Sequence, residues 1–304
     1  ANKLWNGAKF VISAMERAGT VPPAAPTALD HWITSRMHQV HAEVVDDIDR
    51  FRFGEAGRAL QEYLWSEFFD WYVEAAKIRL YGEDEAAIAR VATTLETIYG
   101  CMLRLLHPFM PFVTEEIWKH FRAAGGEPGA SKLLIAAEIC DPSTEIDLAS
   151  IVRIRGVIEI VQGIRNARHE ADVDPGREVE ARISGGAIEF QQEASMIERM
   201  ARVNPLTFHP AGTTFEDPAL TVRAGSAEIT LPVSGLVDLA TEQKRLAREL
   251  LDAQGTLGRA EELLANENFM ARAPEAVILK EKQRAKEARN RVDQVKERME
   301  ALKR

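Results

Sequence analysis

Apolar residues recur every three or four positions along most of the first 121 residues, the spacing that places them on one face of an α-helix. Glycines, prolines and short polar stretches interrupt this pattern, and no strand-like alternation replaces it. Five helices are therefore predicted, near residues 4–18, 27–48, 53–81, 86–106 and 111–121. Because long helices joined by short connections pack as mostly antiparallel neighbours, this part of the chain is predicted to be a helical bundle.

A proline corner joins the last two of these helices. Pro108 cannot continue a helix and Pro111 suits the first turn of the next one, so the chain turns sharply between them. His107 is expected to satisfy a backbone group there, and Phe112 begins an apolar stripe that other helices should cover. The third helix carries an aromatic-rich face that we interpret as core: Tyr63, Leu64, Phe68, Trp71 and Tyr72.

A glycine-rich stretch at residues 125–129 ends the helical pattern and predicts a domain boundary. Beyond it, the pattern predicts helices at 146–171 and 188–203, and strands at 133–139, 179–183, 206–209, 220–224 and 228–233. Two helices against a small mixed or antiparallel sheet form an α+β layer. Arg165, Arg168 and Arg177 lie near His169, as in a phosphate site, but the acidity of this segment favours surface ion pairs.

From Leu239 onward, apolar residues follow a strict four–three repeat that pauses at Asn266 and resumes after Pro274. Two arms of equal length, each ~40 Å long if helical, predict an antiparallel coiled coil within one chain. The predicted fold class is therefore mainly α. It comprises a helical bundle over residues 1–124, a small α+β domain over 125–236, and a coiled-coil hairpin over 237–304.

The net charge of −9 argues against a protein that binds nucleic acid over its whole surface. The charge is distributed unevenly, because the first two segments carry −4 and −7 whereas the hairpin has 15 basic and 13 acidic residues. The last 25 residues alone carry +5. A polyanionic partner would therefore meet the C-terminal end of the chain first.

Candidate chemistry is sparse. Cys101 and Cys140 occur without the spacing of a metal site, which predicts reduced thiols and no metal. Asp70 and Glu74 lie one helical turn apart but lack a nearby histidine, so we interpret them as a solvated face and predict no catalytic residue. No run reaches the ~18 apolar residues of a membrane span and no signal peptide is present, which predicts a cytoplasmic protein without a membrane partner.

Several motifs of the bundle resemble the anticodon-binding domain of class I aminoacyl-tRNA synthetases for valine, isoleucine and leucine. They are Asn2-Lys3-Leu4-Trp5-Asn6 and the stretches at residues 65–74 and 106–118. The middle segment resembles the connecting domain of valyl-tRNA synthetases. Residues 235–239 and the hairpin tip at 266–277 resemble the C-terminal arm of the same family, which narrows the resemblance to the valine enzymes.

This resemblance implies the C-terminal portion of an enzyme that ligates valine to its tRNA with ATP. Because neither the His-Ile-Gly-His nor the Lys-Met-Ser-Lys-Ser type of signature occurs, it also implies that the catalytic and editing domains lie upstream and that this portion is inactive and binds no cofactor. The expected partners are the tRNA for valine and those upstream domains, and a monomer is expected. Two alternatives stay open, a non-catalytic coiled-coil scaffold and the corresponding part of an isoleucyl- or leucyl-tRNA synthetase.

The bundle is expected to read anticodon bases near the ends of its first two helices. Sequence-specific RNA binding stacks unpaired bases on aromatic or arginine planes. Trp32 is the best-placed aromatic residue, with His31, Arg36, Lys9 and Lys3 as its possible partners. The alternative for Trp32 is a buried core tryptophan of the bundle.

Basic residues of the hairpin are expected to grip the tRNA body. Aligning Leu264 with Ile278 places three acids opposite bases, in the pairs Glu242–Arg298, Glu249–Arg291 and Glu261–Lys282. The same register sets Arg284 against Thr256 and leaves Arg289 and Lys296 without an acid across the seam. Exposed ion pairs contribute only ~0.2–1 kcal/mol, so spare cations matter more for binding phosphates. The predicted set is Arg259, Lys280, Arg284, Lys286, Arg289 and Lys296.

Overall fold

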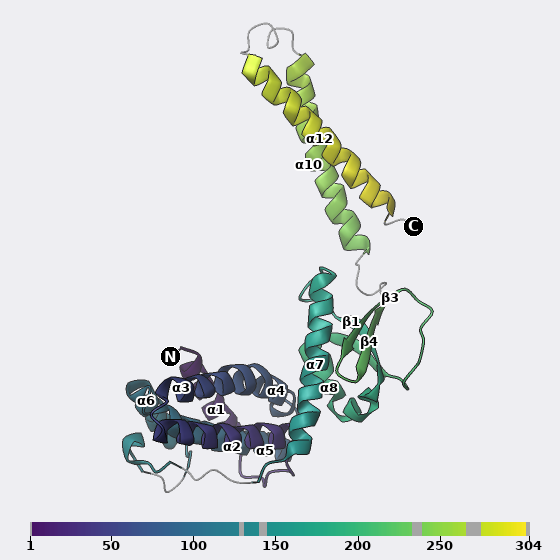
Figure 1. Cartoon of the computed structure of the whole chain (residues 1–304). Helices are drawn as coiled ribbons and strands as arrows, with labels where there is room; N and C mark the ends of the chain where they lie inside the picture. The colour runs from purple at the N-terminus through teal and green to yellow at the C-terminus, as the bar shows by residue number, and fades with distance from the viewer. Residues whose placement is uncertain (1, 128–130, 140–144, 233–238, 266–274, 302–304) are drawn as a thin grey trace. The chain divides into compact units, whose positions relative to one another are not determined.

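A computed structural model describes residues 2–127, 131–139, 145–232, 239–265 and 275–301 (Figure 1). The chain divides into two compact units. The first consists of Ala1–Glu170, Asp174–Glu216 and Leu220–Leu231, and the second consists mainly of Pro232–Arg304. The predicted bundle and middle segment both belong to the first unit, so the boundary proposed between them near residue 124 stays a prediction.

All five predicted helices of the bundle are present. They are α1 (Asn2–Arg17), α2 (Ala28–Asp49), the continuous run of α3 (Phe53–Glu62), η1 (Tyr63–Val73) and α4 (Glu74–Leu80), then α5 (Glu85–Leu106) and α6 (Pro111–Ala123). The middle of the third helix, η1, is π-helical. The start of α2 forms a capping box between Thr27 and Asp30, and the Asp84 carboxylate caps α5 by accepting two backbone N–H groups.

Large aromatic side chains form the core of the bundle, as predicted. Tyr63, Phe68 and Tyr72 are fully buried, and the ring of Phe68 lies 6.1 Å from that of Tyr72. Their polar atoms are satisfied inside the core, since the Tyr63 hydroxyl donates to the Ile33 carbonyl at 3.0 Å. Trp71 departs from the core prediction because it is only half-buried, with the Arg165 guanidinium 5.3 Å from its ring centre.

The proline corner forms where predicted, but two of its side chains differ from expectation. The His107 ring lies 2.9 Å from the Thr114 hydroxyl rather than against a backbone group. The backbone carbonyl of Met110 accepts its hydrogen bond from the Thr114 hydroxyl instead. Phe112 is 92% exposed, so the expectation that other helices cover it is wrong. It occupies the first turn of α6, ahead of the buried stripe of Ile117, Trp118 and Phe121.

The middle segment is an α+β arrangement with a mixed sheet. Its elements are η2 (Leu134–Ala136), α7 (Leu148–Glu170), β1 (Val179–Gly185), η3 (Gly186–Glu193), α8 (Ala194–Ala201), β2 (Val203–Phe208), β3 (Ala219–Ala224) and β4 (Ala227–Pro232). The sheet order is β2-β1-β4-β3, with β1 parallel to β2 and antiparallel to β4. Four of the five predicted strands are confirmed.

Two predictions in this segment need correction. The strand predicted at 133–139 is the short 3₁₀ turn η2, whose Leu134 and Ile135 N–H groups donate to the Glu115 carboxylate instead of to a neighbouring strand. The helix predicted over 188–203 begins as the 3₁₀ segment η3, and only α8 is α-helical. At residues 133–139, the Glu115 side chain thus accepts the backbone hydrogen bonds that a neighbouring strand would otherwise accept.

Two arginines of the middle segment, Arg165 and Arg168, bind backbone carbonyls instead of acids. Arg168 is buried and donates to the carbonyls of Ala201, Arg202, Asp174 and Arg177. Arg165 donates to the Met200 carbonyl at 2.9 Å. The prediction of surface ion pairs is therefore wrong for both. Carbonyls at loops and helix ends lack partners in regular structure, and these guanidinium groups supply them.

The second unit contains the predicted hairpin, α10 (Leu239–Ala265) and α12 (Glu275–Ala301), which lie side by side (Figure 1). Among the hairpin side chains that the structure describes, the buried ones are small: Ala253, Ala260, Ala288, Val292 and Val295. The tip between the helices lies outside the described residues. Among the residues that the structure describes, no helix has the length and apolar character needed to cross a membrane.

Candidate nucleic-acid interface

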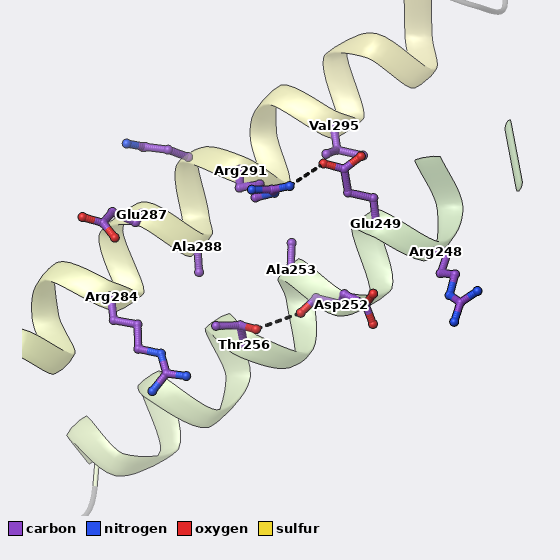
Figure 2. Close-up of a pocket in the computed structure, with 11 residues that line it drawn as sticks. Arg248, Glu249, Asp252, Ala253, Thr256, Arg284, Glu287, Ala288, Arg291 and Val295 are labelled. Carbon is purple, nitrogen blue, oxygen red and sulfur yellow. Dashed lines mark hydrogen bonds and ion pairs between the residues drawn. The ribbon is translucent and has the colours of Figure 1, made fainter. Parts of the chain in front are cut away.

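In the part of the hairpin that the structure describes, two ion pairs cross the seam. Arg291 donates to Glu249 at 2.9 Å, which confirms the predicted register at that point (Figure 2). Arg289 pairs with Glu261 at 2.5 Å, so the predictions that Arg289 lacks an acid and that Glu261 pairs with Lys282 are wrong. The register considered only directly opposite residues, whereas a long guanidinium side chain reaches along the seam. The predicted pair Glu242–Arg298 involves side chains outside the described set.

Arg259 of α10 and Arg284 of α12 both lie in the part of the hairpin that contains Thr256. Figure 2 shows Arg284 extending from α12 toward the part of α10 that carries Thr256, in agreement with the predicted register. The Arg259 guanidinium lies 3.5 Å from the Thr256 hydroxyl. Arg284 pairs only loosely, at 3.7 Å, with Glu281 one turn away, and its side chain stays 56% exposed. Both arginines are exposed on the hairpin.

A cavity of about 960 Å³ lies along this side of the hairpin. Its floor contains Ala253 and Ala288, which point toward each other, and their small size leaves the two helices with an open groove (Figure 2). Its rim carries three arginines and three acids: Arg248, Arg284, Arg291, Glu249, Asp252 and Glu287. Elsewhere on α12, Lys280, Lys286 and Lys296 are exposed, and the structure gives them no ion pair with the residues it describes.

The residues predicted to read the anticodon have mixed environments. Trp32 is 3% exposed, which agrees with the alternative of a core tryptophan and leaves little ring surface for stacking. Lys3 pairs with Asp70 at 2.6 Å, and Arg36 makes a bidentate pair with Glu67 at 2.7 and 2.8 Å. His31 and Lys9 are exposed. Of the five candidates, these last two keep polar atoms most accessible to RNA.

A buried charge network near the start of α2 has no counterpart in the sequence-based prediction. The Asp30 carboxylate is 2% exposed and accepts two hydrogen bonds from Arg79, each 2.7 Å long, and one from the Tyr72 hydroxyl at 2.8 Å. Burial raises the pKa of Asp30, but the hydrogen bonds and charge of Arg79 outweigh it and hold that pKa below its ordinary value. The sequence carries no local signal for the partner Arg79, which is 49 residues away along the chain.

The described side chains offer no group suited to hold a metal ion. Among the described residues, no three His, Cys, Asp or Glu side chains are grouped as a metal would require. Cys101 is buried, with its sulfur 3.9 Å from a ring nitrogen of His41, while Cys140 lies outside the described residues.

Comparisons with known proteins match both the bundle and the hairpin to described families. Residues 30–183 match the family described as the anticodon-binding domain of tRNA ligase, and residues 238–303 match the valyl tRNA synthetase tRNA binding arm. The chain belongs to the valyl-tRNA synthetase family. A valine–tRNA ligase of Syntrophotalea carbinolica is 35% identical over 99% of the chain, and that of Bacillus subtilis is 33% identical over 100% of the chain.

These matches place the family's two named regions on the structure. The anticodon-binding match begins in α2 and ends in β1, so it includes most of the bundle and α7, and the arm match covers the α10–α12 hairpin. The arm match carries the valyl tRNA synthetase description, in agreement with the resemblance predicted for the hairpin. The chain spans about one third, 34%, of the length of these two relatives.

Proposed function

We propose that this chain is the tRNA-binding part of an enzyme that ligates valine to its tRNA with ATP. The pair of family matches carries this proposal, because one covers the bundle and the other the hairpin. The sequence contains neither nucleotide-binding signature of the class, so valine activation and editing are assigned to further domains with which this chain acts in the cytoplasm. The chain itself binds RNA as a monomer, holds no cofactor and performs no chemistry.

The two regions divide the work of binding. The hairpin supplies phosphate contacts from Arg259, Arg284 and its exposed lysines, since each neutralised phosphate releases roughly one counterion. The bundle supplies discrimination among anticodons, with His31 and Lys9 as its accessible polar groups. Arg289 contributes less to phosphate binding than the sequence alone indicated, because Glu261 already neutralises it.

A comparison of several tRNAs tests the proposal. The chain should bind a valine tRNA transcript more tightly than transcripts for isoleucine or leucine, as measured by gel shift at one fixed salt concentration. Equal affinity for all three would remove the valine-specific part of the proposal, and no affinity for any would favour a protein-binding scaffold. In a parallel assay, ATP and valine added to the chain should give no pyrophosphate exchange above background.

A further inference from the structure

Glu281 is an acidic residue in the seam of the hairpin, at a position of α12 where the four–three repeat otherwise places apolar residues. Its side chain is 16% exposed, and its Oε2 atom is buried without a hydrogen-bond partner among the residues that the structure describes. The register set by the Arg291–Glu249 pair places it opposite the turn of α10 that contains the buried Ala260. A carboxylate in these surroundings depends on the nearest cation.

That cation is Arg284, about one turn further along α12. Its Nη1 atom lies 3.7 Å from the Oε1 atom of Glu281, which is beyond hydrogen-bonding distance. The other two arginines whose side chains are described on α12 are hydrogen-bonded to acids, Arg289 to Glu261 at 2.5 Å and Arg291 to Glu249 at 2.9 Å. Arg284 thus differs from both, because an acid attracts it without accepting a hydrogen bond from it.

Arg284 reaches the groove of the hairpin, whereas Glu281 does not. The Arg284 side chain is one of the groove-lining residues and extends toward α10, with more than half of its surface exposed (Figure 2). Glu281 is not among the residues that line the groove, so a polyanion that contacts Arg284 would have this carboxylate behind the guanidinium group. Because a buried charge is screened less than an exposed one, Glu281 attracts Arg284 more strongly than an acid on the surface would.

We infer that Glu281 tunes the affinity of the hairpin for tRNA by competing with phosphate for Arg284. In the chain without tRNA, Glu281 attracts the guanidinium group toward the seam. In the complex, a phosphate oxygen becomes the hydrogen-bond acceptor of Arg284, and the Glu281 carboxylate loses its cation. The free energy of that loss subtracts from the binding free energy. This inference rests on the proposed function and adds a residue that controls one of its phosphate contacts from inside the seam.

A double-mutant cycle in the full chain separates this competition from a general effect of negative charge. The variants are Glu281→Gln, Arg284→Gln and both together, and the measurement is the dissociation constant for a valine tRNA transcript at one fixed salt concentration. The matched control is Glu287→Gln, made alone and together with Arg284→Gln. Glu287 lies three residues after Arg284, as Glu281 lies three residues before it. It accepts a hydrogen bond from Gln283 at 2.8 Å, and the described contacts include no ion pair between it and Arg284.

The competition predicts a specific pattern in this cycle. Glu281→Gln should tighten binding by ~2- to 5-fold, since a partly exposed ion pair contributes up to ~1 kcal/mol. The gain should disappear in the Arg284→Gln background, because no guanidinium group remains for Glu281 to attract. Glu287→Gln should change the affinity by the same factor in both backgrounds. Circular dichroism at 222 nm checks that each variant keeps its helices, and Glu281→Ala serves as a second variant at the same position.

Two results would overturn the inference while leaving the proposed function in place. One is an equal gain from Glu281→Gln with and without Arg284, which would reduce Glu281 to a general repulsive charge. The other is a gain from Glu281→Gln that does not exceed the gain from Glu287→Gln. In both cases the wild-type chain still binds the transcript. A wild-type chain that did not bind the valine tRNA transcript would instead overturn the proposed function together with this inference.

Discussion

The bundle and the hairpin solve the problem of helix packing in opposite ways. The bundle buries large rings such as Tyr63 and Trp118, whereas the hairpin seam buries alanines such as Ala253 and Ala288. The arginines of the two regions also differ in exposure. Arg79 pairs with a buried carboxylate in the bundle, whereas Arg284 stays more than half exposed on the hairpin. Because buried apolar area is the main source of stability, the bundle should be far the more stable of the two.

This difference assigns a different role to charge in each region. In the bundle, an acid and a base satisfy each other inside the core, so removal of either partner leaves an uncompensated buried charge. On the hairpin, ion pairs lie in water, where they contribute little to stability and leave neighbouring cations available for a polyanion. The following predictions test this contrast, from the largest expected effect to the smallest.

Asp30→Ala should lower the free energy of unfolding of the first unit by ~3–5 kcal/mol, because Arg79 loses its buried partner. All five tryptophans belong to that unit, so denaturant unfolding followed by tryptophan fluorescence reports on it alone. Asp70→Ala is the matched control, since it breaks the exposed pair with Lys3 and should change little. Equal effects of both substitutions would remove the distinction between buried and exposed pairs.

Acid should weaken the same network. The pKa of Asp30 is depressed in the folded chain, so its contribution to stability is fully present above the carboxyl's unfolded pKa of ~3.9 and is lost as the pH falls through the lower folded value. The effect should be smaller than that of Asp30→Ala, because a protonated carboxyl group keeps some of its hydrogen bonds. Unfolding free energies measured from pH 6 to pH 3 should therefore fall more steeply for the wild-type chain than for Asp30→Asn.

Ala288→Gly should destabilise the hairpin by ~1 kcal/mol, through the lower helix propensity of glycine at a buried seam position. Circular dichroism at 222 nm should show the earlier loss of helix, while tryptophan fluorescence of the first unit stays unchanged. A shift of both signals together would mean that the two units unfold as one, contrary to the contrast drawn here.

Glu249→Gln should have the smallest effect, ~0.2–1 kcal/mol, because its pair with Arg291 is partly exposed. The same circular dichroism experiment measures it, with Glu262→Gln as a control on the exposed face of α10. A loss of several kcal/mol would show that the seam pairs, rather than the buried alanines, hold the hairpin together.

Periodicity was sufficient to predict the helices and most strands, because burial of one face follows directly from spacing. It failed at residues 133–139, where one carboxylate, Glu115, replaces a strand partner. Contacts between distant residues left no local signal, as in the Asp30–Arg79 pair, which joins positions 49 residues apart. The prediction that Arg289 lacks an acidic partner failed for a related reason. A heptad register gives the residues that face each other but not the direction in which a long side chain extends.

The sharpest test of the account is the salt dependence of tRNA binding by a hairpin double variant, Arg259→Gln with Arg284→Gln. Loss of two phosphate contacts should reduce the slope of log affinity against log salt concentration by about two and weaken binding, with the preference among anticodons unchanged. The control, Glu249→Gln with Arg291→Gln, keeps the net charge and should leave the slope as it is. A double variant with wild-type affinity and slope would contradict the claim that the hairpin binds tRNA through its exposed arginines.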